Sequence, residues 1–133
     1  MRALVVDDQF VSRRILQQYL QGYAETEAVS SGEQALEAIS FALDNAVPFD
    51  LVCLDVEMPG IDGHETLRRL RALEAQHGRH GLSTTKVFMV TAQNNPRSVF
   101  AAFRDQCEAY LVKPVDRNAL ERELINAMLI PRP

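Results

Sequence analysis

The sequence predicts an α/β fold, a doubly wound sheet of five parallel strands with helices on both faces. Short apolar runs alternate five times with longer segments of helical periodicity, the pattern that crossover connections produce. Most of the apolar runs are nearly continuous, which indicates strands that are buried on both faces. Right-handed crossovers leave few topologies, and the common five-stranded order is 2-1-3-4-5.

Length and composition agree with one globular domain. The chain has 133 residues, of which 47% are hydrophobic and 24% charged. The net charge of −4 argues against direct nucleic-acid binding through a basic surface and against attachment to anionic lipid. No apolar run approaches the roughly 20 residues of a membrane span. The N-terminus lacks signal-peptide features, and two distant cysteines favour a reducing cytoplasm.

Two strand–helix units are predicted in the first third of the chain. An apolar strand over Ala3–Val6 precedes a helix over Phe10–Leu20, in which the apolar residues at helical spacing are Val11, Ile15, Leu16, Tyr19 and Leu20. A weaker strand over Glu25–Val29 precedes a helix that runs to Leu43. Two residue pairs offer a capping box for this helix, Ser30 with Glu33 or Ser31 with Gln34.

The third unit occupies the middle of the chain. A continuous apolar strand over Leu51–Leu54 leads to a loop over Met58–Gly63. Asp62 and Glu65 can cap the helix that follows, which has one apolar stripe made by Leu67, Leu70 and Leu73. The segment 77–85 contains two glycines and no periodicity, which predicts a flexible loop.

The last two units complete the alternation. After a strand over Lys86–Val90, Asn95 and Pro96 predict the start of a helix that uses Val99, Phe100 and Phe103. After a strand over Ala109–Val112, Asp116 is predicted to cap a last helix, whose buried face carries Leu120, Leu124, Ile125 and Met128.

Chemically capable residues follow four of the five predicted strands. Asp7 and Asp8 follow the first strand, Asp55 the third, Thr91 the fourth and Lys113 the fifth. Ligands bind at the carboxyl edge of open parallel sheets, where the strand order reverses. In the order 2-1-3-4-5 that point lies between the first and third strands, so the three aspartates are expected to meet there.

Such a set is suited to forming an aspartyl phosphate. Three carboxylates in one crevice repel each other, which favours a hard divalent cation such as Mg²⁺. A carboxylate nucleophile would then have the cation and Lys113 to neutralise charge, and Thr91 to bind a phosphoryl oxygen. Each residue alone could instead be a turn, a helix cap or a solvated charge. Their coincidence at one sheet edge favours phosphoryl transfer.

Four segments also carry a resemblance to a known family: VVDDQFVSRRIL, LVCLDVEMPGIDGHETLRRLR, MVTA and AYLVKPVD. They are similar to the receiver domains of bacterial two-component response regulators, whose fold is the flavodoxin-like (βα)₅ sheet of the chemotaxis response regulator. The resemblance implies a receiver domain over residues 1–130, followed by a C-terminal tail or the start of a linker over 131–133.

The resemblance implies a role for each residue of the cluster. Asp55 would be the phosphoacceptor, and Mg²⁺ (or Mn²⁺) would be the cofactor. Asp8 and Asp55 would bind the metal directly, and Asp7 mostly through water. The backbone carbonyl of Glu57 would complete the protein ligands. Lys113 would contact the phosphoryl group, and its bond to the following proline would be cis.

Residues around the cluster are implied to form a switch. Thr91 would turn inward on phosphorylation, and Tyr110 would swing with it. Glu57 and Gln93 would tune the lifetime of the phosphoryl group. The responding surface would be the fourth helix, fifth strand and fifth helix, with Arg97, Arg104 and Tyr110 on it.

The implied function is a phosphorylation switch in the cytoplasm. The chain would accept a phosphoryl group from a sensor histidine kinase or a phosphotransfer protein and then present a changed surface to a downstream protein target. Phosphorylation could also drive a homodimer through that surface. The domain would catalyse its own phosphorylation and dephosphorylation without being a turnover enzyme. Neither nucleic acid nor membrane is expected as a direct partner.

Several alternatives stay open at this point. A stand-alone regulator is favoured, and the close alternative is a receiver fragment of a larger response regulator or hybrid kinase. A phosphohydrolase that uses an aspartyl phosphate would need a second acid, for which Glu57 is the one candidate. A flavin-binding module would need a phosphate loop after the first strand, which is not seen. A phosphate-independent binding module would not need the complete active-site set.

One departure from the family pattern affects the end of the fourth helix. The family often places glycine there, whereas this chain has Gln106 and Cys107. A left-handed residue at Gln106 would be strained, so we expect this helix to end differently.

The remaining histidines and cysteines have structural explanations. His77 and His80 are expected in a surface loop without a metal, and His64 as an exposed or half-buried helix residue. Cys53 is expected to fill the core, whereas Cys107 could be exposed.

Overall fold

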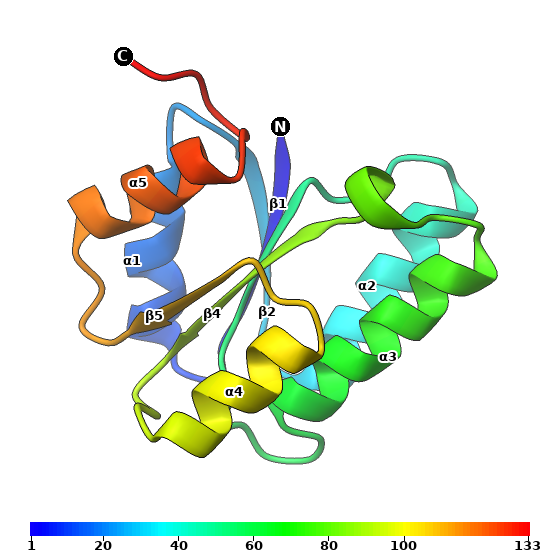
Figure 1. The fold of residues 1–133 in the computed structure, drawn as a ribbon, viewed down its shortest axis with the longest axis horizontal. Helices are drawn as coiled ribbons and strands as arrows, with labels where there is room; N and C mark the ends of the chain where they lie inside the picture. Colours follow the sequence, from blue (N-terminus) through cyan, green and yellow to red (C-terminus); the bar gives the residue numbers. More distant parts are fainter.

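The protein is described by a computed structural model that covers residues 1–133 (Figure 1). The strands are β1 (Arg2–Val6), β2 (Glu25–Val29), β3 (Leu51–Leu54), β4 (Lys86–Thr91) and β5 (Ala109–Val112). The helices are α1 (Phe10–Leu20), α2 (Gly32–Asp44), α3 (Gly63–Gln76), α4 (Pro96–Arg104) and α5 (Arg117–Asn126). One parallel sheet has the order β2-β1-β3-β4-β5, which confirms the predicted fold class. No helix is long and apolar enough to span a bilayer.

Two separate cores hold the helices to the sheet. Helices α1 and α5 cover one face, and α2, α3 and α4 cover the other (Figure 1). Alternate residues of β1 serve the two cores, because successive side chains of a strand point to opposite faces. Leu4 and Val6 belong to the core under α2 and α3, whereas Ala3 and Val5 belong to the core under α1 and α5. The central strands are therefore apolar throughout, as the sequence predicted.

Side-chain caps begin three of the helices. Ser31 accepts a hydrogen bond from the backbone N–H of Gln34 and begins α2, which decides between the two capping pairs. Asp62 and Asn95 begin α3 and α4 in the same way, as expected. The expectation for α5 was wrong in one respect: Asp116 occupies the N-cap position, but its side chain makes no capping hydrogen bond.

Several apolar residues that contributed to the predicted helical periodicity are exposed, and so is Met128, which was predicted to be buried. In α4 the exposed fraction is 70% for Phe100 and 48% for Phe103, because only the narrow stripe of Ser98 and Ala102 is buried. Val11 and Ile15 of α1 are also exposed, as is Met128. Met128 lies beyond the end of α5 and has a left-handed backbone. The helical periodicity located these helices correctly but did not show how little of each one the sheet covers.

The end of α4 contradicts the expectation for Gln106. This residue has φ 75°, the left-handed conformation that was expected to be avoided. The amide of Cys107 donates to the carbonyl of Ala102, so the helix closes with one of the usual C-terminal hydrogen bonds. The Gln106 carbonyl accepts a 2.6 Å hydrogen bond from Arg71. Tertiary contacts thus hold a conformation that the residue type alone disfavours.

Both cysteines are buried. Cys53 is fully buried and Cys107 is 6% exposed, so the expectation that Cys107 could be exposed was wrong. Burial raises the pKa of each thiol to about 12. Both are therefore neutral core residues.

A buried ionic network centred on Arg71 joins α3 to the amino ends of β4 and β5. The Arg71 guanidinium donates to Glu74 Oε1 at 2.7 Å and to the carbonyl of Thr85 at 2.8 Å. It also contacts Glu108 Oε2 at 3.3 Å. Glu74 is 1% exposed, and its second oxygen accepts the Thr85 amide at 2.6 Å. Glu108 accepts the Val87 amide at 2.6 Å. We call this set the Arg71 network.

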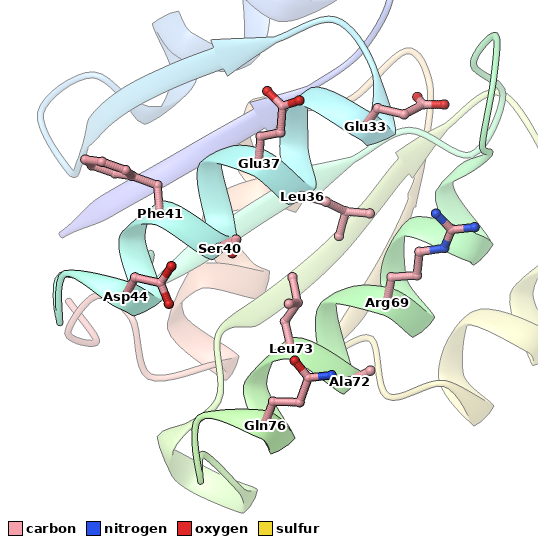
Figure 2. A pocket seen from close by; sticks show the side chains of 10 residues that line it. All are labelled: Glu33, Leu36, Glu37, Ser40, Phe41, Asp44, Arg69, Ala72, Leu73 and Gln76. Carbon is pink, nitrogen blue, oxygen red and sulfur yellow. The ribbon is translucent and has the colours of Figure 1, made fainter.

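A groove of about 660 Å³ lies between the outer faces of α2 and α3 (Figure 2). Leu36 and Leu73 form its apolar floor, and Phe41 stands at its edge with 69% of its surface exposed. None of the three aspartates at the carboxyl edge lines this groove. It is therefore separate from the site described next.

Candidate functional site

The register of the sheet brings the predicted aspartates together. Val6 of β1 is paired with Leu54 of β3, so the residues that follow these strands emerge side by side. The amide of Asp55 donates to the carbonyl of Val6 at 3.0 Å and holds the two strand ends in place. Carboxylate oxygens of Asp7, Asp8 and Asp55 lie within 4.8 Å of one another. We call these three residues the acidic cluster.

The acidic cluster is buried on one side and open on the other. Asp7 is 1% and Asp55 5% exposed, whereas Asp8 is exposed to solvent. One oxygen of Asp7 accepts the amide of Gln9 at 2.9 Å. The Oδ1 atom of Asp55 is buried and has no hydrogen-bond partner. A buried carboxylate oxygen without a partner is costly, so this atom is available for a ligand.

Lys113 supplies the positive charge at the cluster. Its Nζ lies 2.6 Å from Asp7 Oδ2 and 3.2 Å from Asp55 Oδ2. Its bond to Pro114 is cis, as expected. Burial lowers the pKa of Lys113, but the hydrogen bond to Asp7 and the charges of both carboxylates outweigh burial and raise the pKa overall. The ammonium group therefore stays protonated.

The pKa of Asp55 is raised above its ordinary value. Burial is the largest cause, and the negative charge of Asp7 adds to it. The nearby Thr91 hydroxyl and Lys113 oppose this shift but do not cancel it. The ionised form of Asp55 is thus under-stabilised without a further cation.

The donor set fits Mg²⁺. Three ionised carboxylates facing one ammonium leave an excess of two negative charges. Asp55 also contributes a buried oxygen without a hydrogen-bond partner. Mg²⁺ prefers oxygen ligands, uses one or two carboxylates and retains water, which the open side at Asp8 allows.

Two predicted switch residues meet at Gln93. Thr91 is fully buried at the end of β4, and its hydroxyl oxygen accepts the Gln93 amide at 3.2 Å. The half-buried Tyr110 donates its phenol proton to the Gln93 carbonyl at 2.8 Å. One loop residue thus contacts both side chains.

Sequence reasoning missed the surroundings of Tyr110. The Ser98 hydroxyl lies 2.8 Å from the Tyr110 hydroxyl, and His64 Nε2 lies 2.9 Å from Ser98 Oγ. His64 is half-buried, which agrees with the expectation of an exposed or half-buried helix residue. His64 and Ser98 lie on different helices, so no motif or spacing could have paired them.

Glu57 and Gln93 lie close to each other in the structure. Both line one pocket of about 450 Å³, together with Val56, Met58, Pro59 and Asp62. The two positions that resemblance assigned to tuning are therefore neighbours in space.

The comparisons with known proteins identify the family and the fold. The family described as the response regulator receiver domain matches residues 3–125. The transcriptional regulatory protein ResD of Bacillus subtilis is 34% identical over 113 residues, covering 85% of this chain and 42% of ResD. The two-component response regulator ORR41 of rice (Oryza sativa subsp. japonica) is 29% identical, covering 90% of this chain and 87% of ORR41. The chain thus spans less than half of one of these relatives and most of the other.

Solved structures with the same fold include the receiver domain of the Arabidopsis thaliana histidine kinase CKI1. Its complex with Mg²⁺ and BeF₃⁻ is 27% identical and superposes with a TM-score of 0.78, covering 92% of this chain and 88% of that one. The Borrelia burgdorferi CheX–CheY complex with BeF₃⁻ and Mg²⁺ has a TM-score of 0.80 at 22% identity, covering 96% of this chain and 89% of that one, and shows the fold alone.

Proposed function

This chain belongs to the response regulator receiver domain family of two-component systems, and from that premise we propose that it accepts a phosphoryl group on Asp55. The observation that carries the proposal is the state of the Asp55 carboxylate. One oxygen contacts Lys113 at 3.2 Å, and the other is buried without a partner. A carboxylate held in this way is oriented for attack and lacks only the ligands that a metal or phosphoryl group brings.

The metal proposed for this site is Mg²⁺ (or Mn²⁺). Asp8 and Asp55 would bind it directly, Asp7 mostly through water, and Glu57 through its backbone carbonyl. The closeness of the three carboxylates supports this assignment. So does the CKI1 receiver, which was solved with Mg²⁺. When bound, the metal would neutralise charge on the phosphoryl oxygens and the acceptor.

The proposed reaction is a direct transfer from a phosphohistidine. An oxygen of Asp55 attacks phosphorus, the phosphorus–nitrogen bond breaks, and the imidazole leaves with the bonding electrons. Lys113 stays protonated and balances the charge of the transferred group, and the Thr91 hydroxyl donates to one of its oxygens. Attack of water on the same phosphorus breaks its bond to the Asp55 oxygen, releases inorganic phosphate and returns Asp55 to its carboxylate. The chain thus modifies and restores itself without acting on a released substrate.

The proposed output is the surface formed by α4, β5 and α5. Phosphorylation adds about −1.5 to −2 charge beside Thr91, and Thr91 and Tyr110 both contact the loop that precedes α4. Three exposed apolar residues give this surface the character of a docking site: Phe100, Phe103 and Val112. We propose a downstream protein as its target, with a homodimer as the alternative occupant.

The phosphodonor is proposed to dock beside α1. Phe10 and Val11 are 65% and 67% exposed, and they lie in the first turn of the helix that follows the acidic cluster. A sensor histidine kinase or a phosphotransfer protein would present its histidine there. We also propose a cytoplasmic location and a stand-alone regulator with residues 1–130 as the receiver domain.

Glu57 and Gln93 are proposed to set the lifetime of the phosphoryl group. Both side chains line one pocket. Glu57 comes two residues after Asp55 and would place negative charge near the acceptor.

Acetyl phosphate provides the test of this function. Intact-mass measurement with Mg²⁺ should show one added phosphoryl group on the wild type. The gain should vanish with a chelator and in Asp55→Asn, whereas Asp50→Asn, a control in the loop before β3, should keep it. Absence of the gain, together with failure to bind beryllofluoride, would contradict the proposal. Sustained hydrolysis of a phosphomonoester would favour the phosphohydrolase instead.

A further inference from the structure

A continuous line of hydrogen bonds runs from the first turn of α3 to the loop after β4. His64 Nε2 contacts Ser98 Oγ at 2.9 Å, Ser98 Oγ contacts the Tyr110 hydroxyl at 2.8 Å, and that hydroxyl contacts the Gln93 carbonyl at 2.8 Å. The four residues come from α3, α4, β5 and the β4–α4 loop. Figure 1 shows the amino end of α3 beside α4.

The direction of every hydrogen bond in this line is determined by its last member. The Gln93 carbonyl can only accept, so Tyr110 must donate its single proton there. The Tyr110 oxygen must then accept from Ser98, which has one proton to give. Ser98 in turn must accept from His64 Nε2, which therefore carries a proton.

This order also specifies the state of the imidazole ring. His64 Nδ1 is buried and has no partner. A ring protonated at both nitrogens would place a second donor where no acceptor exists. The line of hydrogen bonds therefore requires a proton on Nε2, and the Nε2–H tautomer supplies it without adding a second buried donor.

From this arrangement we infer that His64 and Ser98 are positioning residues that hold Tyr110 inward and so couple α3 to the switch. The inference rests on the proposed function for its meaning, because Tyr110 is the residue expected to move. Ser98 is 8% exposed, so its hydroxyl depends on these partners and not on water. Outward movement of Tyr110 would leave the Gln93 carbonyl without its donor and the Ser98 proton without its acceptor.

The consequence is that less free energy is needed to shift the domain to its activated conformation. If the inward position of Tyr110 is already favoured by α3 and α4, phosphorylation has less rearrangement to drive. Loss of one neutral hydrogen bond should shift the inward–outward equilibrium by roughly 2- to 10-fold. The phosphoryl mimic beryllofluoride, added with Mg²⁺, should then be needed at correspondingly higher concentration.

The test combines two nuclear magnetic resonance measurements. Long-range ¹H–¹⁵N spectra of the unliganded protein should show His64 as the neutral Nε2–H tautomer. In protein labelled with 3-fluorotyrosine, the Tyr110 fluorine signal is assigned with Tyr110→Phe. His64→Leu and Ser98→Ala should each increase its exposure to solvent and raise the half-saturating beryllofluoride concentration by about 2- to 10-fold.

Matched variants separate positioning from packing. His64→Gln keeps an N–H donor at the position of Nε2. Its Tyr110 solvent exposure and its half-saturating beryllofluoride concentration should therefore match those of the wild type, and Ser98→Thr, which keeps the hydroxyl, should match them too. His80→Leu, in the exposed loop after α3, should change neither. Alanine has a high helix propensity, so Ser98→Ala should fold, and it tests the positioning role even if His64→Leu does not fold.

The inference is overturned by an Nδ1–H tautomer of His64 in the wild type, because that tautomer has no proton on Nε2 to donate to Ser98. It is equally overturned if His64→Leu or Ser98→Ala leaves the Tyr110 signal and the half-saturation unchanged. Acetyl phosphate should still modify Asp55 in both variants. If the wild type binds no beryllofluoride, the proposed function fails, while the tautomer and the solvent exposure of Tyr110 still decide the positioning role.

Discussion

At the amino edge of the sheet the Arg71 network pairs its charges, whereas at the carboxyl edge the acidic cluster keeps an excess of negative charge. Both oxygens of Glu74 have partners, and Glu108 accepts from Arg71 and from the Val87 amide. Asp55, by contrast, keeps a buried oxygen without a partner beside two more carboxylates. One lysine contacts two of the three carboxylates, those of Asp7 and Asp55.

The difference separates stability from function. Buried charges that are paired hold elements in register, and removing one partner is strongly destabilising. A cluster with excess charge and an unpartnered atom is stabilised only when a ligand arrives. The same sheet thus has one edge that fastens α3 to β4 and β5 and another that is prepared for a cation and a phosphoryl group.

The largest effect is expected at the Arg71 network. Arg71→Met should lower the free energy of unfolding by about 3–5 kcal/mol, because Glu74 would remain buried without its counter-ion. Arg69→Met is the matched control, since Arg69 is exposed and pairs only with Glu65 at the surface. It should change stability by less than about 1 kcal/mol. Urea unfolding measures the stability of both variants. Equal losses of stability would show that the buried Arg71 network contributes no more than a surface ion pair.

Mg²⁺ should act on the other edge alone. At 100 times its dissociation constant it should stabilise the wild type by about 2.7 kcal/mol. Asp8→Asn and Asp55→Asn should lose most of this gain, whereas Glu108→Gln, in the Arg71 network, should keep it. Thermal unfolding with and without Mg²⁺ measures the increment. A gain of similar size in all variants would mean that the cation binds elsewhere.

Without metal, removing a charge from the acidic cluster should stabilise the fold. Asp55→Asn relieves repulsion with Asp7 and avoids burying an ionised group, so we expect a gain of about 1 kcal/mol in chelator at neutral pH. Glu74→Gln removes a charge from the paired edge and should destabilise instead. Chemical denaturation in the presence of a chelator measures the change in the free energy of unfolding of both variants. A loss of stability in Asp55→Asn would contradict the proposed difference between the two edges of the sheet.

The smallest expected effect is on the pH dependence of stability. Burial raises the pKa of Asp55 in the folded protein. Between the unfolded and folded pKa values the native state binds more protons, so stability rises as pH falls through the folded pKa and declines as pH returns to neutral. Burial raises the pKa of Glu108 too, which gives the same sign at the other edge. Unfolding curves of Asp55→Asn and Glu108→Gln in chelator should each lack part of this slope.

The acidic cluster could be predicted from the sequence because strand ends are local features. An apolar run that stops at Asp7 or Asp55 marks a strand terminus, and parallel strands place their carboxyl termini at one edge. The register between β1 and β3 then needed no further information. The roles implied by resemblance fell on the same residues.

The Arg71 network could be suspected from the sequence only in part. Arg71 and Glu74 share a face with Leu67 and Leu70 at a spacing of three and four residues, so two charges lie on the buried stripe of α3. That pattern was a signal that both would be paired inside. Their partners, Thr85, Gln106 and Glu108, come from other segments and could not be read from it.

By itself the sequence determined the order of elements and the edge where its chemistry lies, because apolar periodicity marks each element and parallel strands place their carboxyl ends at one edge. It also predicted the topology of the sheet, because parallel crossovers allow few strand orders. Only the tertiary structure decided how much of α4 is covered, that Gln106 adopts a left-handed backbone, and that His64 reaches Tyr110 through Ser98. These features depend on side chains meeting across different elements. Such meetings follow from packing in three dimensions, for which the spacing along one chain contains no rule.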